Sequence, residues 1–516
     1  MDYFLGLDIG TSGVKAALVD EKGRVKSTVT RPHPLLTPQP GWAEQRPDDW
    51  WKSAAAATRK VLAAAHVPQN RIAAVGLSGQ MHSSVFLDQE NRVIRPALLW
   101  CDGRTTEECR DITREVGEDR LREWVSNPAL EGFTLPKVLW LKKHEPQSFA
   151  RLEKVVLAKD YVRYRLTGTL ASEPSDASAT LMYDTAARRW SSSIMQAMAL
   201  SLRLLPDVGE STEVLGWVHS SAAKASGLAQ GTPVVGGGAD NACGAIGVGL
   251  VSPGEAVASW GTSGTILTPT RQPLVDPGLR AHTFCHAVPD TWYLMGVMLT
   301  AGGAFEWHRR ELAKELEKRK DAHRMLDREA AAIAPGAEGL TFLPYLQGER
   351  TPHRDASARG AFVGLSLAHT RAHLSRAVIE GICFGMRDAL TIVRNLVPIE
   401  TILLTGGGAQ SPFLRQMQAD VYGLPVVRVN QEEGPAYGAA LLAAVGAGVF
   451  TDVATACRKT LKRLAPQPFD EGAHRAYADP YRRYGALYPA LRSLTPHGSG
   501  ALARTSETGR PATGAS

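Results

Sequence analysis

The four residues Gly10-Thr11-Ser12-Gly13 recur unchanged as Gly261-Thr262-Ser263-Gly264 in the second half of this 516-residue chain. Each copy lies between two stretches whose apolar residues alternate as in a strand, so each copy predicts a β-hairpin. A tip of two glycines and two small hydroxyl residues exposes N–H and O–H donors without bulk, which suits a phosphate group. One such tip alone is better explained as an ordinary tight turn. Two identical tips in equivalent strand contexts favour duplicated halves that face one nucleotide.

The composition of the chain is that of an ordinary globular protein. Hydrophobic residues make up 44% and charged residues 21%, and the net charge of +6 is scattered, which indicates a solvated basic surface rather than a nucleic-acid site. No apolar stretch approaches the length that crosses a bilayer, and the first residues lack the pattern of a signal peptide. The six cysteines form no CxxC pair, which fits a reducing compartment. We therefore expect a cytoplasmic protein that binds neither nucleic acid nor membrane.

A polar loop follows an early buried strand. Residues 3–30 predict three strands, residues 47–65 a helix, and residues 72–77 a strand that ends at Ser78-Gly79-Gln80-Met81-His82. Ligands often bind at such carboxyl ends of strands in α/β proteins. A purely structural interpretation stays open, in which His82 is a neutral histidine that only completes the hydrogen bonds of its loop. Asp102 has a similar alternative, as a turn residue before a glycine.

A carboxylate follows another strand end in the middle of the chain. Residues 233–235 run into three glycines, then into Asp240 and Asn241, and a helix rich in small residues is expected over 242–249. The glycines leave space around the carboxylate, which favours a catalytic role. Aspartate is also a good helix N-cap, so that interpretation stays open as well.

The residues Gly406-Gly407-Gly408-Ala409 form a third glycine-rich site, between an expected strand and an expected helix. This turn could admit a base and ribose close to the backbone, or it could be only a tight crossover. The common phosphate and dinucleotide loops, GxxxxGK[ST] and GxGxxG, are absent, and so are the GxSxG and HExxH motifs. A phosphate-binding protein built on hairpins resembles the actin-like ATPases, in which two related domains close over ATP.

Two longer segments resemble signatures of the FGGY family of sugar kinases: residues 132–144 (GFTLPKVLWLKKH) and residues 360–380. The resemblance extends from about residue 3 to about residue 490. It implies an α/β fold with two ribonuclease H-like domains of the actin/hexokinase type, at residues 1–250 and 251–490, flanking a cleft for nucleotide and sugar. The tail at 491–516 is poor in large apolar residues and is expected to be disordered.

Shorter motifs resemble the members of this family that act on D-xylulose more than those that act on glycerol. These motifs are GWAEQ at 41–45, QMH at 80–82, WCDGR at 100–104 and GERTPH at 348–353. Ser83 is a local departure, because these relatives often have a glycine there, and it puts the exact shape of the sugar pocket in doubt.

The resemblance implies roles for individual residues. Asp240 would be the general base, and Asp8 would hold Mg²⁺ near the phosphates through water. The residues that would line the sugar site are Gln80, Met81, His82, Asp102 and Asn241. The residues that would bind the nucleotide are Gly10, Thr11, Ser12, Lys15, Gly261, Thr262, Ser263, Gly407, Gly408 and Ala409.

The implied activity is phosphorylation of D-xylulose to D-xylulose 5-phosphate, with ATP and Mg²⁺ as cofactors and a homodimer left open as the assembly. Such a transfer depends on positioning and charge neutralisation, and an aspartate is ionised at neutral pH and can accept the sugar proton. Three alternatives remain. The first is a kinase of the same family for ribulose, deoxy-xylulose or another sugar or polyol. The second is a catalytically silent sugar- or nucleotide-binding regulator. The third is a filament-forming relative of actin.

Overall fold

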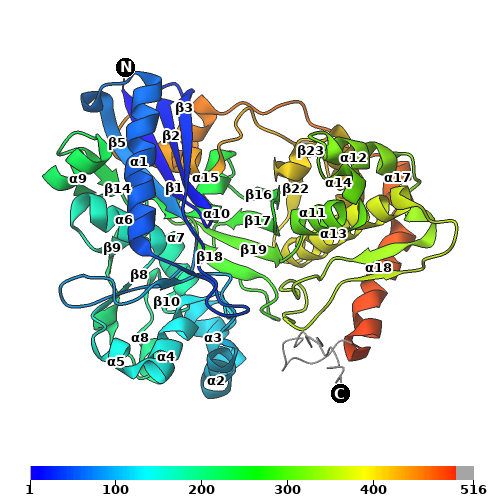
Figure 1. Ribbon diagram of the computed structural model, residues 1–516, viewed down its shortest axis with the longest axis horizontal. Coiled ribbons are helices and arrows are strands. Elements are labelled where there is room, and N and C mark those ends of the chain that lie inside the picture. Colours follow the sequence, from blue (N-terminus) through cyan, green and yellow to red (C-terminus); the bar gives the residue numbers. More distant parts are fainter. Residues whose placement is uncertain (1, 495–516) are drawn as a thin grey trace, which may run out of the picture.

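The computed structural model describes residues 2–494 and contains two lobes, each built on one large mixed β-sheet (Figure 1). The part of the expected disordered tail beyond residue 494 lies outside the described residues. The first sheet has seven strands in the order β13-β14-β5-β1-β2-β3, with β15 paired to β5, and the second has six in the order β18-β19-β17-β16-β22-β23. Their bounds are β1 Tyr3–Ile9, β2 Gly13–Asp20, β3 Val25–Pro32, β5 Ile72–Gly79, β13 Val214–Trp217, β14 Pro233–Val235, β15 Gly238–Ala239, β16 Gly254–Trp260, β17 Gly264–Thr270, β18 His282–Cys285, β19 Trp292–Met298, β22 Ile399–Gly406 and β23 Val426–Val427.

Helices and short two-stranded ribbons surround these sheets. The helices are α1 Pro47–Ala65, α2 Thr106–Val116, α3 Glu118–Val125, α4 Thr134–His144, α5 Pro146–Ala150, α6 Ala158–Thr167, α7 Pro174–Ala177, α8 Ser192–Ala197, α9 Ser220–Ser226, α10 Asp240–Gly247, α11 Gly302–Leu312, α12 Ala322–Ala331, α13 Arg371–Arg394, α14 Pro412–Tyr422, α15 Gly434–Gly446, α16 Val453–Thr460, α17 Glu471–Ala476 and α18 Ala478–Leu491. The ribbons pair β4 Glu44–Gln45 with β7 Ala97–Leu98, β6 Val85–Leu87 with β8 Lys154–Val156, β9 Ala171–Ser172 with β12 Asp207–Val208, β10 Tyr183–Asp184 with β11 Arg189–Trp190, and β20 Thr341–Leu343 with β21 Ala361–Val363.

The two large sheets repeat one arrangement. Strand β1 is antiparallel to β2 and parallel to β5, and strand β16 is likewise antiparallel to β17 and parallel to β22. The β1–β2 and β16–β17 turns carry the two copies of the Gly-Thr-Ser-Gly sequence. Both predicted hairpins, and the α/β architecture of two related halves, are therefore confirmed.

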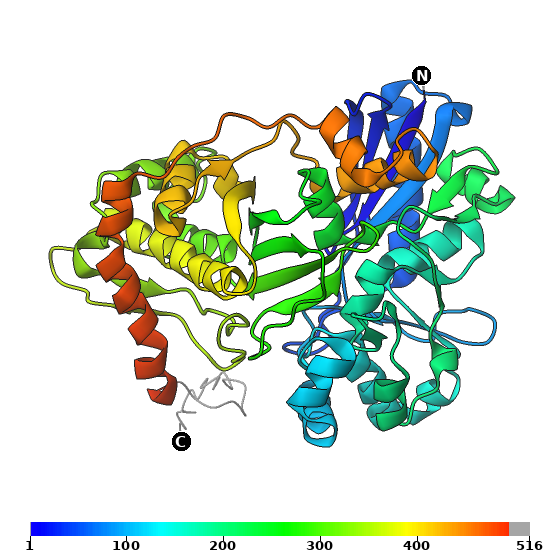
Figure 2. The same ribbon diagram turned by 180° about the vertical axis from the view of Figure 1, so that it is seen from behind.

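Helices cover both faces of the first sheet, and one of them arrives from the far end of the chain. Helix α1 packs on β2 and β3, whereas α15 packs on β1, β5 and α10 (Figure 2). Glycines allow this second contact to be made between backbones. A Cβ atom on Gly6 would lie 1.8 Å from the Ala436 carbonyl oxygen, and one on Gly438 would lie 1.9 Å from the Cys243 carbonyl oxygen. The division into domains at residues 250/251 stays a prediction. Helix α15 lies in the predicted second domain by sequence, but it packs on the sheet of the first.

The second lobe is organised around its longest helix. Helix α13 packs on β17, β19 and β20 and also contacts α11, α12 and α14. Its buried residues include Val378, Cys383, Phe384 and Ile392, which form part of the apolar core of this lobe. Across residues 2–494, the helices lack the combination of length and apolarity that a membrane span requires.

The close contact between α15 and α10 leads to a stability prediction. We expect Gly438→Ala to lower the free energy of unfolding by roughly 1–3 kcal/mol, because its methyl group overlaps the Cys243 carbonyl. The matched control is Gly485→Ala in α18, where no atom lies within 4 Å of the added Cβ. This control should raise stability by up to about 1 kcal/mol through helix propensity. Urea denaturation of both variants measures the difference, and equal effects would contradict the proposed backbone contact.

Candidate active site

Both hairpin tips are closed by a backbone hydrogen bond. The Gly10 N–H donates to the Gly13 carbonyl at 3.1 Å, and the Gly261 N–H donates to the Ser263 carbonyl at 3.0 Å. Ser12, Gly261 and Thr262 are exposed at these tips. The tips are thus tight turns, and they also present small residues to solvent. The first property fits a purely structural role, and the second is what phosphate binding requires.

The first tip is joined to the loop after β5 by a chain of side-chain hydrogen bonds. The Thr11 hydroxyl donates to Gln80 Oε1 at 3.0 Å and accepts from Trp100 Nε1 at 2.9 Å. Gln45 Nε2 donates to the Thr11 carbonyl at 2.6 Å, and Gln80 Nε2 donates to Gln45 Oε1 at 3.0 Å. Thr11 was expected to bind the nucleotide and Gln80 the sugar, and in the structure the two side chains contact each other. Gln45 and Trp100 belong to motifs visible in the sequence, but only the fold shows what they connect.

Two acidic side chains, Asp8 and Asp240, lie where β1, β5 and β15 end together. Asp8 is opposite Ser78 of β5, and Gly238 of β15 is also opposite Ser78. Desolvation raises the pKa of Asp8 to about 6, although the neighbouring Ser78 hydroxyl and, after it, the positive charge of Lys15 oppose this rise. Desolvation, and secondly the charge of Asp8, raise the pKa of Asp240 to about 7. The Oδ1 atom of Asp8 is buried and accepts no hydrogen bond from the described residues.

Asp240 is the first residue of α10 and not its N-cap. Ala239 occupies the cap position, and α10 begins two residues before the predicted start at 242. The Asn241 backbone N–H and Nδ2 donate to Asp240 Oδ1 at 2.7 and 3.0 Å, and Asn241 Nδ2 also lies 3.4 Å from Met81 Sδ. Three predicted site residues are thereby in direct contact, and the capping interpretation of Asp240 is wrong.

His82 is a neutral histidine with a defined tautomer. Burial lowers its pKa to about 3, and the positive charges of Lys137 and Arg350 act in the same direction. Its Nδ1 lies 2.5 Å from the Ala179 carbonyl oxygen, which can only accept, so Nδ1 carries the proton. Nε2 is then an acceptor, so a role toward a sugar hydroxyl is compatible with the structure and stays a prediction.

Asp102 uses its carboxylate within its own loop. Arg104 donates from its backbone N–H and Nε to Oδ1 at 3.0 and 2.8 Å, and from Nη2 to Oδ2 at 2.7 Å. The Ala43 N–H donates to Oδ2 at 2.6 Å. The Arg104 guanidinium also lies 3.6 Å from the Trp42 ring centre. These contacts occupy the carboxylate, so sugar binding by Asp102 is an untested prediction that requires this loop to rearrange.

A cavity of about 690 Å³ in the second lobe gathers part of the predicted nucleotide site. Gly261, Thr262 and Gly407 line it, together with Gly302 and Gly303 at the start of α11. The predicted turn residue Gly408 is buried instead, where a Cβ would lie 2.5 Å from the Trp260 ring. Sequence reasoning missed Gly302 and Gly303, although they are the first two residues of the amphipathic helix α11.

The remaining predicted nucleotide residues lie at the edges of this arrangement. Ser263 forms the closing turn of the second tip, and the Ala409 carbonyl accepts from Arg415 Nη1 at 3.0 Å. Lys15, opposite Asp8 in the β1–β2 register, forms an ion pair with Glu433 just before α15. In this state Lys15 links the first sheet to the segment that returns from the second lobe.

Comparisons with known proteins agree with this arrangement. Residues 3–247 match the N-terminal domain, and residues 256–447 the C-terminal domain, of the FGGY family of carbohydrate kinases. The chain is 38% identical to the xylulose kinase of Bacillus subtilis strain 168, over 96% of this chain and 97% of that protein. It also resembles two solved structures from Lactobacillus acidophilus, a ligand-bound xylulose kinase (TM-score 0.90) and a gluconate kinase (TM-score 0.89), each 26% identical, over 96% of this chain and 99% of each of theirs.

These matches cover both lobes and both hairpins. The chain belongs to the FGGY family of carbohydrate kinases. The family resemblance of the 132–144 and 360–380 segments is thereby confirmed. The individual roles of the site residues stay predictions.

The pKa of Asp240 has a consequence for stability. A carboxyl whose pKa is raised by folding binds its proton more tightly in the folded state, so stability falls as pH rises from about 4 to about 7. We expect Asp240→Asn to unfold at a higher temperature than the wild type near about pH 8 without metal, with a smaller difference near about pH 5. Thermal unfolding at both pH values measures this.

The control for this measurement is Asp290→Asn. Asp290 is exposed and has a φ of 51°, a conformation that asparagine also adopts. The control should match the wild type at both pH values. A stability gain in Asp240→Asn that does not depend on pH would argue against the raised pKa.

Proposed function

We propose that this chain transfers the γ-phosphate of ATP to D-xylulose, giving D-xylulose 5-phosphate and ADP, with Asp240 as the general base. Membership of the kinase family supports ATP as the donor. The name of the Bacillus subtilis relative, which is similar over nearly its full length, supports the sugar. The observation that carries the role of Asp240 is its position beside Met81 and Asn241 with a pKa raised to about 7. A base with a pKa near ambient pH accepts a proton far better than an ordinary aspartate does.

The chemistry assigned to Asp240 follows from its hydrogen bonds. Both hydrogen bonds that it accepts from the described residues go to Oδ1, and both come from Asn241. Oδ2 is left to take the proton of the sugar 5-hydroxyl as that oxygen attacks the γ-phosphorus and the bond to ADP breaks. Positioning by Asn241 matters because phosphoryl transfer gains most of its rate from orientation and charge stabilisation.

The donor atoms around Asp8 fit a divalent cation. Its buried Oδ1 has no hydrogen-bond partner among the described residues, and Asp8 and Asp240 raise the local negative charge. Carboxylate oxygens and water are the ligands that Mg²⁺ prefers. When bound there, Mg²⁺ would neutralise the charge of the transferring phosphate. Asp8 would hold it through water, while the hairpin tips and the cavity at α11 would hold the nucleotide.

A second candidate substrate follows from the gluconate kinase structure, because it is as similar in fold as the xylulose kinase structure from the same organism. Overall fold therefore does not separate these sugars. The silent-regulator and filament alternatives are weaker, because Asp8 and Asp240 are both present at the ends of β1 and β15, strands that each pair with β5. Neither alternative requires this pair.

The decisive assay measures ADP release with Mg-ATP and D-xylulose, D- and L-ribulose, glycerol or gluconate. We expect a strong preference for D-xylulose, and a loss of about 10²- to 10⁴-fold in kcat in Asp240→Asn, because the general base is removed. Asp290→Asn should match the wild type. Preference for another sugar would keep the kinase and replace the substrate. Absence of sugar-stimulated turnover, with ATP still bound, would favour a regulator.

Asp8 has a separate test. We expect Asp8→Asn to require at least about tenfold more Mg²⁺ for half-maximal activity at fixed ATP, since the carboxylate that would orient the hydrated ion is lost. A magnesium titration of ADP release, alongside Asp290→Asn as the control, measures this. An unchanged magnesium dependence with lowered activity would assign Asp8 a role that does not involve the metal.

A further inference from the structure

A cluster of buried charged side chains lies beside Asp240 in the first lobe. It is built from α6, α7 and the residue before α7, and its members are Lys159, Asp160, Arg163, Glu173 and Asp176. All of these side chains are fully buried. Three acids face two bases, so the cluster carries an excess of negative charge when all five are ionised.

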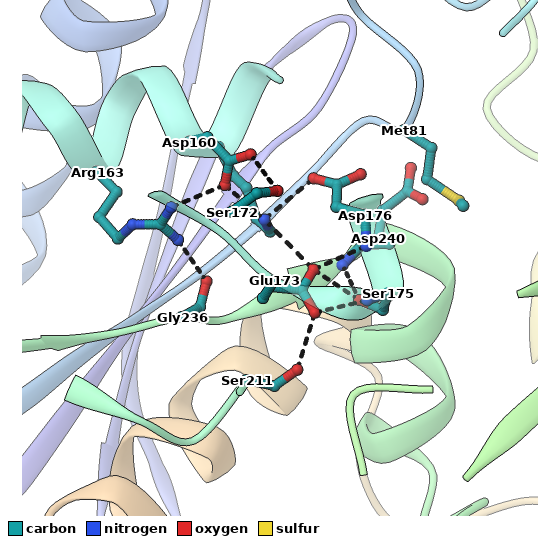
Figure 3. Close-up of polar contacts among 12 residues, drawn as sticks. Met81, Asp160, Arg163, Ser172, Glu173, Ser175, Asp176, Ser211, Gly236 and Asp240 are labelled. Atoms are coloured by element: carbon teal, nitrogen blue, oxygen red, sulfur yellow. Dashed lines mark hydrogen bonds and ion pairs between the residues drawn. The ribbon is translucent and has the colours of Figure 1, made fainter. Parts of the chain in front are cut away.

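Two of the three acids have all the partners that a buried carboxylate needs (Figure 3). Asp160 accepts from Lys159 at 2.7 Å, from Arg163 at 3.0 Å and from the Ser172 hydroxyl at 2.8 Å. Glu173 accepts from two backbone N–H groups at the start of α7 and from two serine hydroxyls, all at 2.8–2.9 Å. These two acids are explained by structure alone.

Asp176 is different, because neither of its carboxylate oxygens accepts a hydrogen bond from the described residues. Its one ionic contact joins Oδ2 to Lys159 Nζ at 3.1 Å. A buried carboxylate without hydrogen bonds is costly and requires an explanation. Burial holds the pKa of Asp176 well above its usual range, and Asp160 and Glu173 add to this rise.

Asp176 is held next to the catalytic carboxylate. The neighbouring Ser175 hydroxyl accepts from the Ala239 N–H at 2.9 Å, immediately before Asp240. Figure 3 draws the carboxylates of Asp176 and Asp240 beside each other, with Asp240 on the side of Met81 and one Asp176 oxygen joined to Lys159 Nζ. Tyr293 of β19 approaches from the second lobe, with its hydroxyl 3.9 Å from Met81 Sδ. Burial raises the pKa of Tyr293, and Asp240 and Asp176 both contribute, which places the three groups near one another.

We propose that Asp176 is a sugar-binding residue, which accepts hydrogen bonds from hydroxyl groups adjacent to the one that Asp240 deprotonates. This inference rests on the proposed function. Lys159 Nζ holds Oδ2 at 3.1 Å, and Oδ1, which has no partner among the described residues, matches the O–H donors of a polyhydroxylated substrate. A site built to bind a hydroxyl discriminates strongly against an analogue that lacks it, because the buried acceptor is then unpaired. Asp176 would therefore select for hydroxylated carbons beyond the reacting one.

The test is calorimetric binding of D-xylulose to the full chain without ATP. We expect Asp176→Asn to weaken sugar binding by roughly 10- to 100-fold, with Mg-ATP binding unchanged. Asp160→Asn is the matched control, since Asp160 contacts the same lysine but directs its oxygens to Arg163 and Ser172. Asp176→Glu keeps the charge and moves the oxygens, so it should not restore sugar binding.

Deoxy analogues of D-xylulose identify the hydroxyl. For the analogue that lacks the group bound by Asp176, wild type and Asp176→Asn should bind equally. The proposal is overturned if the variant weakens every analogue by the same factor, if Asp160→Asn has the same effect, or if Asp176→Glu restores sugar binding. If the wild type does not bind D-xylulose at all, the proposed substrate fails, and the same comparison is made with the sugar that the wild type phosphorylates.

Discussion

The packing of α15 against β1, β5 and α10 is the contact on which the site depends. It is made between backbones, because glycines stand where a side chain would collide with a carbonyl oxygen. Gly76 of β5 shows this as Gly6 and Gly438 do, since its Cβ would lie 2.0 Å from the Ala439 carbonyl oxygen. The contact fixes α10 against the sheet, and thereby places Asp240 beside the end of β1. A bulkier interface would separate Asp240 from Asp8.

The placement of Asp8 and Asp240 opposes the stability of the fold. Two carboxylates with raised pKa values, close together and shielded from water, are an arrangement that a purely structural protein has no reason to keep. The neighbouring residues do not neutralise the pair with a hydrogen-bonded base. Lys15, whose positive charge acts on Asp8, is paired with Glu433. In the proposed reaction, Asp8 would accept the charge of a Mg²⁺ ion and Asp240 would accept a proton.

Local sequence was enough to predict the hairpins, the glycine-rich strand ends and the position of Asp240 at one of those ends. Alternation of apolar residues and glycine content can be recognised within a few neighbouring residues. It was not enough for contacts made across long separations. Thr11 was expected on phosphate, yet its hydroxyl contacts Gln80, which the register of β1 and β5 brings near, and Trp100, which follows β7. The sequence also could not show that the Asp176 carboxylate accepts no hydrogen bond from the described residues, since this depends on how the side chains around Lys159 are arranged. The packing of α15 on the first sheet could not be predicted from neighbouring residues either. A helix of small residues can pack on any surface where glycines allow a close approach.

The return of α15 to the first sheet also constrains the order in which the protein can assemble. One face of that sheet is covered by residues 434–446, which the ribosome delivers after nearly the whole second lobe. The first lobe therefore cannot complete its core while it is being synthesised. Until α15 is available, the apolar face of β1 and β5 stays uncovered. Completion of that face joins segments more than 350 residues apart, which makes the nascent chain of this kinase dependent on protection until α15 emerges.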